Sequence, residues 1–116
     1  MTALKYLSVQ APLEKVNMLE DKQSRYIHDY VKKSEYAIVG KIRRNGFSQG
    51  DVDRQWMKIV NMIRKKQING VVVANMAAVS SSMADAYYKV GLIIEAGGIV
   101  VTVDEGRLEM HIKEVA

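Results

Sequence analysis

The sequence predicts a three-layer α/β/α protein: helices cover both faces of a four-stranded, mainly parallel sheet with an antiparallel C-terminal edge strand. Two observations predict this fold. Short apolar runs alternate along the chain with longer segments whose apolar residues recur every three or four positions, and strands that alternate with helices form parallel sheets. The length of 116 residues is that of one domain, so residues 1–116 are expected to share a single core.

The first strand is expected at residues 3–9, where Leu4, Tyr6 and Val9 have few polar neighbours. A long helix follows from Pro12, because apolar residues recur at spacings of three, four and seven. These residues are Val16, Leu19, Tyr26, Ile27, Tyr30 and Val31.

Residues 36–42 form a mostly apolar run that is typical of a buried parallel strand. The loop at residues 43–50 is rich in turn residues, and Asp51 is expected to cap the second helix. Its apolar stripe is Val52, Trp56, Ile59, Val60 and Ile63. We expect Trp56 in the core rather than stacked on a nucleic-acid base.

Residues 71–74 (Val-Val-Val-Ala) predict a central strand. Ser80, Ser81 and Ser82 then offer caps to a third helix, or else contacts from a helix N-terminus to a phosphate. The apolar stripe of this helix is Met83, Ala86, Tyr87, Val90 and Ile94. The seven methionines of the chain are expected to fill such apolar stripes.

A fourth strand is expected at residues 99–103, followed by a hairpin loop at residues 104–106 in which Gly106 supplies a positive φ. In residues 107–116, Leu108, Met110 and Ile112 alternate with polar residues, which favours an antiparallel edge strand. The alternative is a short helix that uses Leu108, Ile112 and Val115.

Several classes of protein and of site are excluded by composition. The chain has no cysteine, which removes disulfides, thiol catalysis and cysteine zinc sites. No apolar run approaches the roughly 20 residues of a membrane span, and the N-terminus lacks the pattern of a secretory signal. We therefore expect a cytoplasmic protein with no membrane contact.

No cofactor and no metal are expected. The turn after the first strand is Gln10-Ala11-Pro12, whereas a dinucleotide or phosphate site needs glycines there. His28 and His111 are the only histidines, and neither has carboxylates at metal-ligand spacing. A Ser-His-Asp arrangement of Ser8, His28 and Asp29 is disfavoured because His28 falls in the middle of a helix.

Positive charge is concentrated in one part of the chain. The formal net charge is +4, and residues 25–66 hold eleven Lys or Arg against four Asp or Glu. Such an excess is typical of contact with a polyanion, although a solvated helix face would give the same count. The candidate DNA-binding residues are Lys41, Arg43, Arg44 and Arg54.

Ligands of parallel α/β folds bind beyond the carboxyl ends of the strands. In this chain the predicted rim consists of residues 10–12, 43–50, 75–81 and 104–106. A chemical function is expected there.

Four stretches together resemble the catalytic domain of the serine recombinases, the resolvase/invertase family. Tyr6-Leu7-Ser8-Val9 is similar to the family's first strand, Tyr-x-Arg-Val-Ser, and residues 50–55 (Gly-Asp-Val-Asp-Arg-Gln) resemble the segment that introduces its next helix. Residues 68–73 (Ile-Asn-Gly-Val-Val-Val) resemble the third strand, and residues 95–106 resemble the following helix end, strand and turn. The resemblance implies a resolvase-like fold over about residues 3–106.

The same resemblance predicts an active site that lacks its catalytic side chains. The family's nucleophilic serine falls on Gln10, and the arginine two residues before it falls on Ser8. The family's Asp-Arg-x-x-Arg segment falls on Ala77, Ala78 and Ser81. Because arginines stabilise the charge that develops on an attacked phosphodiester, their loss predicts a catalytically inactive domain, a pseudoenzyme.

Three functions compete as interpretations of the sequence. The first is an inactive domain of a DNA-recombination system, such as a mobile element, that acts by pairing with itself or with an active recombinase, or by weak non-specific DNA binding. The second is an active recombinase with Ser8 as a displaced nucleophile. The third is an unrelated α/β ligand-binding domain with an apolar rim pocket formed by Pro12, Ala77 and Ala78. The family's long dimerisation helix has no counterpart in residues 107–116, so the chain is either a natural remnant or a shortened protein.

Overall fold

The computed structural model describes residues 1–9, 11–44 and 49–108. Its strands are β1 (Thr2–Leu7), β2 (Ala37–Arg43), β3 (Gly70–Val73), β4 (Ile99–Thr102) and β5 (Gly106–Leu108). Its helices are α1 (Leu13–Val31), α2 (Gln49–Arg64), α3 (Met76–Val79) and α4 (Met83–Glu95). The alternation of strands and helices agrees with the sequence pattern, except for the short helix α3.

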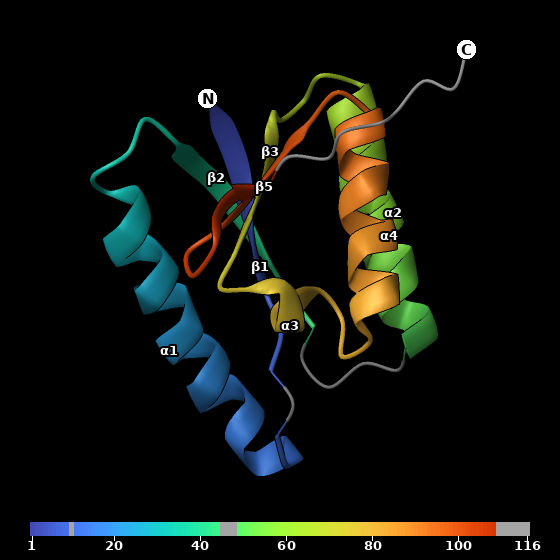
Figure 1. The fold of residues 1–116 in the computed structure, drawn as a ribbon. Coiled ribbons are helices and arrows are strands. Elements are labelled where there is room, and N and C mark those ends of the chain that lie inside the picture. Colours follow the sequence, from blue (N-terminus) through green and yellow to red (C-terminus); the bar gives the residue numbers. More distant parts are fainter. Residues whose placement is uncertain (10, 45–48, 109–116) are drawn as a thin grey trace.

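The five strands form one sheet in the order β2-β1-β3-β4-β5. The first four are parallel, and β5 pairs antiparallel with β4. Helix α1 lies on one face of the sheet, and α2 and α4 lie side by side on the other (Figure 1). The predicted three-layer α/β fold with an antiparallel edge is therefore confirmed.

The larger part of the core lies between the sheet and the pair α2 and α4. Trp56 of α2 is 1% exposed there, as expected for a core residue. Its ring meets that of Tyr6 edge-on, with centroids 5.4 Å apart and planes at 86°, the geometry that aromatic quadrupoles favour. Burial of the Tyr6 ring raises the pKa of its hydroxyl to about 12. A smaller cluster under α1 contains Ala3, Leu7, Ile27, Val31, Val72 and Val101.

Two glycines have roles that no other residue fills easily. A Cβ on Gly70 would lie 2.3 Å from the carbonyl oxygen of Ile99, its partner on β4. Gly106 has φ of 79° at the turn between β4 and β5, as the hairpin prediction requires.

The prediction of a buried second strand is wrong. β2 pairs only with β1, because β1 also pairs with β3 and so takes the inner position. An edge strand is covered less completely, and Val39 on β2 is 56% exposed. A short apolar run does not by itself distinguish an inner strand from an edge strand.

The helices also differ from the predictions in detail. Helix α2 begins at Gln49, so Asp51 lies in its first turn instead of capping it. Ser82 caps α4 as predicted, accepting a hydrogen bond from the amide of Asp85. The predicted stripe of α4 is partly wrong, because Met83 and Tyr87 are exposed whereas Lys89 is buried.

Several methionines lie outside the core, contrary to expectation: Met1, Met18, Met57 and Met83 are exposed. Tyr26, which the helical period of α1 assigns to the buried face, is 47% exposed because it reaches across to Asp104. Residues 107 and 108 belong to the antiparallel strand β5, as predicted. Met110, Ile112 and the remainder of the segment 109–116 lie outside the described residues.

Candidate functional site

The carboxyl ends of β1, β3 and β4 meet at one rim of the sheet, beside the N-terminal end of α3 (Figure 1). An open pocket of about 420 Å³ lies at this rim. Its lining residues are Ser8, Val9, Asn75, Ala77, Ala78 and Ser81. None of these six side chains is charged. Five are aliphatic or carry a hydroxyl, and Asn75 carries a neutral amide.

Ser8 continues β1 into the pocket and is 7% exposed. The side-chain amide of Gln23 on α1 holds the Ser8 backbone from both sides. The Gln23 Oε1 accepts from the Ser8 N–H at 2.8 Å, and the Gln23 Nε2 donates to the Ser8 carbonyl at 2.9 Å. This pair of bonds replaces the strand pairing that β1 loses after Leu7, so the position of Ser8 is well determined.

A hydrogen-bond network borders the pocket at the ends of β3 and β4. The Asn75 Oδ1 accepts from the N–H of Ala78 at 3.0 Å and so caps α3. The Asn75 Nδ2 donates to Asp104 at 3.0 Å, and the hydroxyl of Tyr26 on α1 donates to the other carboxylate oxygen of Asp104.

This network keeps a carboxylate ionised at the rim. The hydrogen bond from Tyr26, followed by that from Asn75, lowers the pKa of Asp104 below its usual 3.8. The same bond raises the pKa of the Tyr26 hydroxyl. The rim prediction included Asn75 and Asp104 as loop residues but gave them no role, although each polar residue follows an apolar strand. The link to Tyr26 has no signal in the sequence because it joins residues 78 positions apart.

Two of the four candidate DNA-binding cations are held by carboxylates. Arg43 forms ion pairs with Asp21 and, at 4.0 Å, with the fully buried Glu20 of α1. Its hydrogen bond lowers the pKa of Asp21. Arg54 pairs with Asp51 one turn before it on α2.

The other two cations differ in exposure. Lys41 is exposed and lies opposite Lys5 across the β1–β2 pair. Burial and the neighbouring Lys41 lower the pKa of Lys5. Arg44 is half-buried at the end of β2, with its Nε enclosed. Three of the four cations are divided between the two sides of the sheet, because Lys41 and Arg43 face α1 whereas Arg54 lies on α2.

The described residues contain no group of three or more His, Asp or Glu side chains that could hold a metal ion. His28 is exposed on α1, away from the rim pocket, and His111 lies outside the described residues. No helix within the described ranges is long and apolar enough to cross a membrane.

Solved structures of other proteins share this architecture, although sequence comparisons find no match. No family model and no curated protein sequence matches the chain. The N-terminal catalytic domain of TP901-1 integrase superposes with a TM-score of 0.73 at 18% identity, over 91% of this chain and 79% of that one. The chain has the fold of a serine recombinase catalytic domain.

Two further solved structures agree with this assignment. A resolvase family site-specific recombinase from Streptococcus pneumoniae gives a TM-score of 0.74 at 17% identity, over 91% of this chain and 74% of that one. The C-terminal catalytic domain of ISC1926 TnpA, an IS607-like serine recombinase, gives 0.68 at 16% identity, over 89% and 70%. The resemblance inferred from the sequence is confirmed at the level of the resolvase-like fold.

The structure brings together four of the five positions at which the resemblance expects catalytic groups. Ser8, Ala77, Ala78 and Ser81 all line the rim pocket, although 69 residues separate Ser8 from Ala77 in the chain. Gln10, where the family's serine falls, lies outside the described residues. Pro12, predicted to line an apolar pocket with Ala77 and Ala78, is exposed and is not among the lining residues.

Proposed function

We propose that this chain is a resolvase-like domain of a DNA-recombination system that has lost strand-cleavage chemistry and acts by association with other macromolecules. The observation that carries this proposal is the lining of the rim pocket. The described side chains that form it include no arginine, lysine or histidine.

The physical argument concerns charge. Attack on a phosphodiester adds negative charge to its oxygens, and preorganised cations supply most of the stabilisation. Removing one such donor costs roughly 10²–10³ in rate. Here the resemblance assigns arginines to three positions that hold Ser8, Ala78 and Ser81, and the ionised carboxylate of Asp104 borders the pocket through Asn75. An anionic transition state is therefore disfavoured at this rim.

Ser8 is the residue that would support an active enzyme instead, because its side chain lies in the pocket. A serine hydroxyl needs a neighbouring base or cations to become a good nucleophile. The hydrogen bonds at Ser8 involve its backbone and the neutral amide of Gln23. This arrangement supports a positioned but unactivated serine.

A plasmid assay tests the loss of cleavage. Supercoiled DNA is incubated with the wild-type chain and with Ser8→Ala, and nicked product and covalent protein–DNA adduct are measured on denaturing gels. We expect neither product from either protein. An adduct formed by the wild type and absent from Ser8→Ala would replace the proposal with the displaced-nucleophile enzyme.

The DNA contact in this proposal is weak and non-specific. Lys41 and Arg54 are the exposed candidates; Arg54 pairs with Asp51, and Arg43 pairs with Asp21, whereas Lys41 forms no ion pair among the described residues. Phosphate contacts alone give dissociation constants of about 10⁻⁴–10⁻⁶ M that rise steeply with salt. Fluorescence anisotropy with duplex DNA at low and high salt measures this, with Lys41→Ser as the variant and Lys66→Ser, on the C-terminal side of α2, as the matched control. A flat signal at low salt would remove DNA from the proposed partners.

Association with protein is the other part of the proposal, either as a homodimer or with an active recombinase. Sedimentation velocity with and without duplex DNA separates self-association from DNA-dependent assembly. The remaining candidate, a small-ligand domain, is favoured only by the pocket volume of about 420 Å³. Thermal shifts on addition of nucleotides or small anions would support that candidate against ours.

A further inference from the structure

A pocket of about 290 Å³ lies at the end of the sheet opposite the rim pocket. Its lining residues are Ile63, Arg64, Lys66, Ile68, Asn69, Ala96 and Gly97. These residues lie where α2 leads into β3 and where α4 leads into β4, that is, at the amino ends of two neighbouring parallel strands. We call this hollow the amino-end pocket.

The polar side chains of the amino-end pocket offer hydrogen-bond donors and positive charge. Arg64 and Lys66 are exposed, and no ion pair joins either of them to an acid among the described residues. The Asn69 Oδ1 accepts from the N–H and the hydroxyl of Thr2 at 2.8 Å and 3.2 Å. These bonds fix the orientation of the amide, so its Nδ2, which donates to no described residue, is the end left for a ligand. None of the described lining side chains is acidic.

Lys66 holds a backbone conformation that favours glycine. Its φ of 59° makes it the only residue other than glycine with a positive φ in the part of the chain that the structure describes. The N–H groups of Lys66 and Gln67 donate to carbonyls of α2 at 3.0 Å and 2.9 Å, a common pattern at the end of a helix. Helix α4 ends in the same pattern, and the corresponding residue there is Gly97, with φ of 89°. A lysine is less favourable than a glycine at this position, which indicates a role for its charge.

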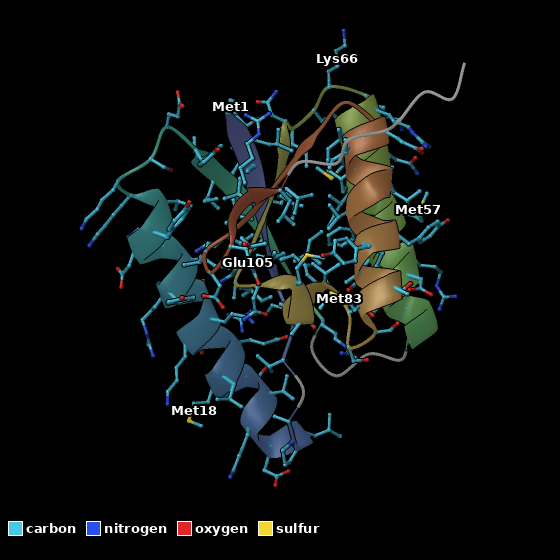
Figure 2. All side chains as sticks on the ribbon, in the orientation of Figure 1. Met1, Met18, Met57, Lys66, Met83 and Glu105 are labelled. Atoms are coloured by element: carbon cyan, nitrogen blue, oxygen red, sulfur yellow. The ribbon has the colours of Figure 1, made fainter. Side chains whose placement is uncertain are left out.

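We infer that the amino-end pocket binds an acidic side chain of a partner protein, next to which the partner carries an apolar residue. A carboxylate accepts hydrogen bonds from guanidinium, ammonium and amide groups, and the charged donors make these bonds strong. Figure 2 shows Lys66 extending from this end of the molecule, far from Met83, so its ammonium can close over a bound carboxylate. Ile63, Ile68 and Ala96 provide an apolar surface for the neighbouring residue of the partner.

This apolar surface favours a protein partner over nucleic acid. A phosphodiester is also anionic, but its neighbours along the strand are sugars and further phosphates, which do not cover Ile63 and Ile68 as an apolar side chain would. The inference rests on the proposed role in association and names a surface and the chemistry of the partner. It is tested without DNA, so the loss or retention of strand cleavage leaves it unaffected, and its failure would leave association through other surfaces in place.

The amino-end pocket can be tested without the natural partner. The probe is the peptide N-acetyl-Leu-Glu-Leu amide, with N-acetyl-Leu-Gln-Leu amide as a neutral control of nearly the same shape. The reporters in ¹⁵N-edited spectra are the side-chain amide of Asn69 and the backbone amides of residues 63–69 and 96–98. We expect saturable shifts confined to these groups with the glutamate peptide and much smaller shifts with the glutamine peptide.

Two matched substitutions separate the pocket from the general positive charge at this end of α2. Arg64→Gln and Lys65→Gln each remove one exposed cation, but only Arg64 lines the pocket. Cations near the end of a helix also interact with its macrodipole, and this role does not distinguish the two residues. We expect the dissociation constant of the glutamate peptide to rise about two- to five-fold in Arg64→Gln, the effect of one partly exposed ion pair, and to change little in Lys65→Gln.

Lys66→Gly tests whether the lysine serves the pocket or only the end of the helix. Glycine adopts a positive φ without strain, so the midpoint of thermal unfolding should rise by about 2–4 °C. The affinity for the glutamate peptide should nevertheless fall by the same factor as in Arg64→Gln. A variant that is more stable and binds less well is the result expected where a residue is retained for binding.

Three results would overturn the inference. The first is equal shifts with the glutamate and glutamine peptides. The second is an equal loss of affinity in Arg64→Gln and Lys65→Gln, or wild-type affinity in Lys66→Gly. The third is displacement of the peptide by duplex DNA or by inorganic phosphate at the same concentration, because the pocket would then bind phosphate groups. Unchanged spectra of each variant away from the substituted residue establish that the variants are folded.

Discussion

Substitution of Gly70 by alanine provides a sharp test of the sheet, because β3 and β4 approach each other at this residue. The added Cβ would lie 2.3 Å from the Ile99 carbonyl oxygen and 2.4 Å from the Ile99 Cγ1. Side-chain carbons do not approach oxygens closer than about 3 Å, so the two central strands must separate by about 0.7 Å or more. Gly70 is buried and its neighbours are backbone atoms of a paired strand, which leaves little room for relaxation.

Overpacking of this kind costs about 1–3 kcal/mol, and more where backbone must move; we expect about 3 kcal/mol for Gly70→Ala. With an unfolding entropy of about 2.1 cal/mol/K per residue, 1 kcal/mol corresponds to about 4 °C for 116 residues. The midpoint of thermal unfolding should therefore fall by about 12 °C. Urea titration followed by Trp56 fluorescence measures the free energy of unfolding directly.

The matched control is Gly50→Ala. Gly50 is exposed near the start of α2, and an added Cβ would lie 3.9 Å from the Arg54 guanidinium, an ordinary van der Waals distance. Because alanine favours a helix over glycine, this substitution should stabilise the protein by up to about 1 kcal/mol. The same chemical change is thus expected to have opposite signs at two positions. A free energy of unfolding of Gly70→Ala within 0.5 kcal/mol of the wild type would refute the close approach of β3 and β4.

Two further predictions concern the rim and the end of β2. Tyr26→Phe removes the main cause of the lowered pKa of Asp104, so that pKa should rise toward 3.8 in a carboxyl ¹³C titration. A carboxyl group whose pKa is lowered by folding stabilises the fold fully at pH values above its pKa in the unfolded chain. The difference in free energy of unfolding between the wild type and Tyr26→Phe should therefore vanish as the pH falls through the native pKa. An unmoved pKa of Asp104 would contradict the hydrogen bond. Arg43→Met should destabilise the protein by about 1–3 kcal/mol because it removes the guanidinium that pairs with Asp21 and lies 4.0 Å from the buried Glu20. Lys41→Met at the exposed site on the same strand should change the free energy of unfolding by less than about 0.5 kcal/mol, and equal losses in urea titrations would remove the structural role of Arg43.

Most of the fold is predictable from local patterns because strands and helices have different periods. The run Val71 to Ala74 predicts the central strand, and Ser82 predicts the start of α4. The edge position of β2 is not predictable in this way, since it depends on which strands pair with β1. Helix α3 is missed because its four residues are too few to show a period.

The candidate site is predictable to the extent that topology determines it. Residues after parallel strands meet at one rim, so Asn75 and Ala77 are expected there, whereas Ser8 is predicted inside the first strand and is connected with them only through the resemblance. The ion pairs of Arg43 with α1 are not, because carboxylates at positions 20 and 21 show no relation in sequence to an arginine at 43. A count of basic residues therefore overstates the charge that is free to meet DNA.

The replacement of several groups at once leads to a last prediction about Gln10, the position at which the resemblance expects the nucleophile. Gln10→Ser supplies the hydroxyl but none of the cations, and each missing donor costs roughly 10²–10³ in rate. Since Ser8, Ala78 and Ser81 stand where arginines are expected, the single variant should form no measurable covalent adduct with plasmid DNA. Combining it with Ser8→Arg, Ala78→Arg and Ser81→Arg restores the cations around the same pocket, and circular dichroism verifies that the combined variant is folded. An adduct formed by Gln10→Ser alone would mean that the fold stabilises the transition state through groups other than these arginines, and the electrostatic argument for an inactive domain would fail.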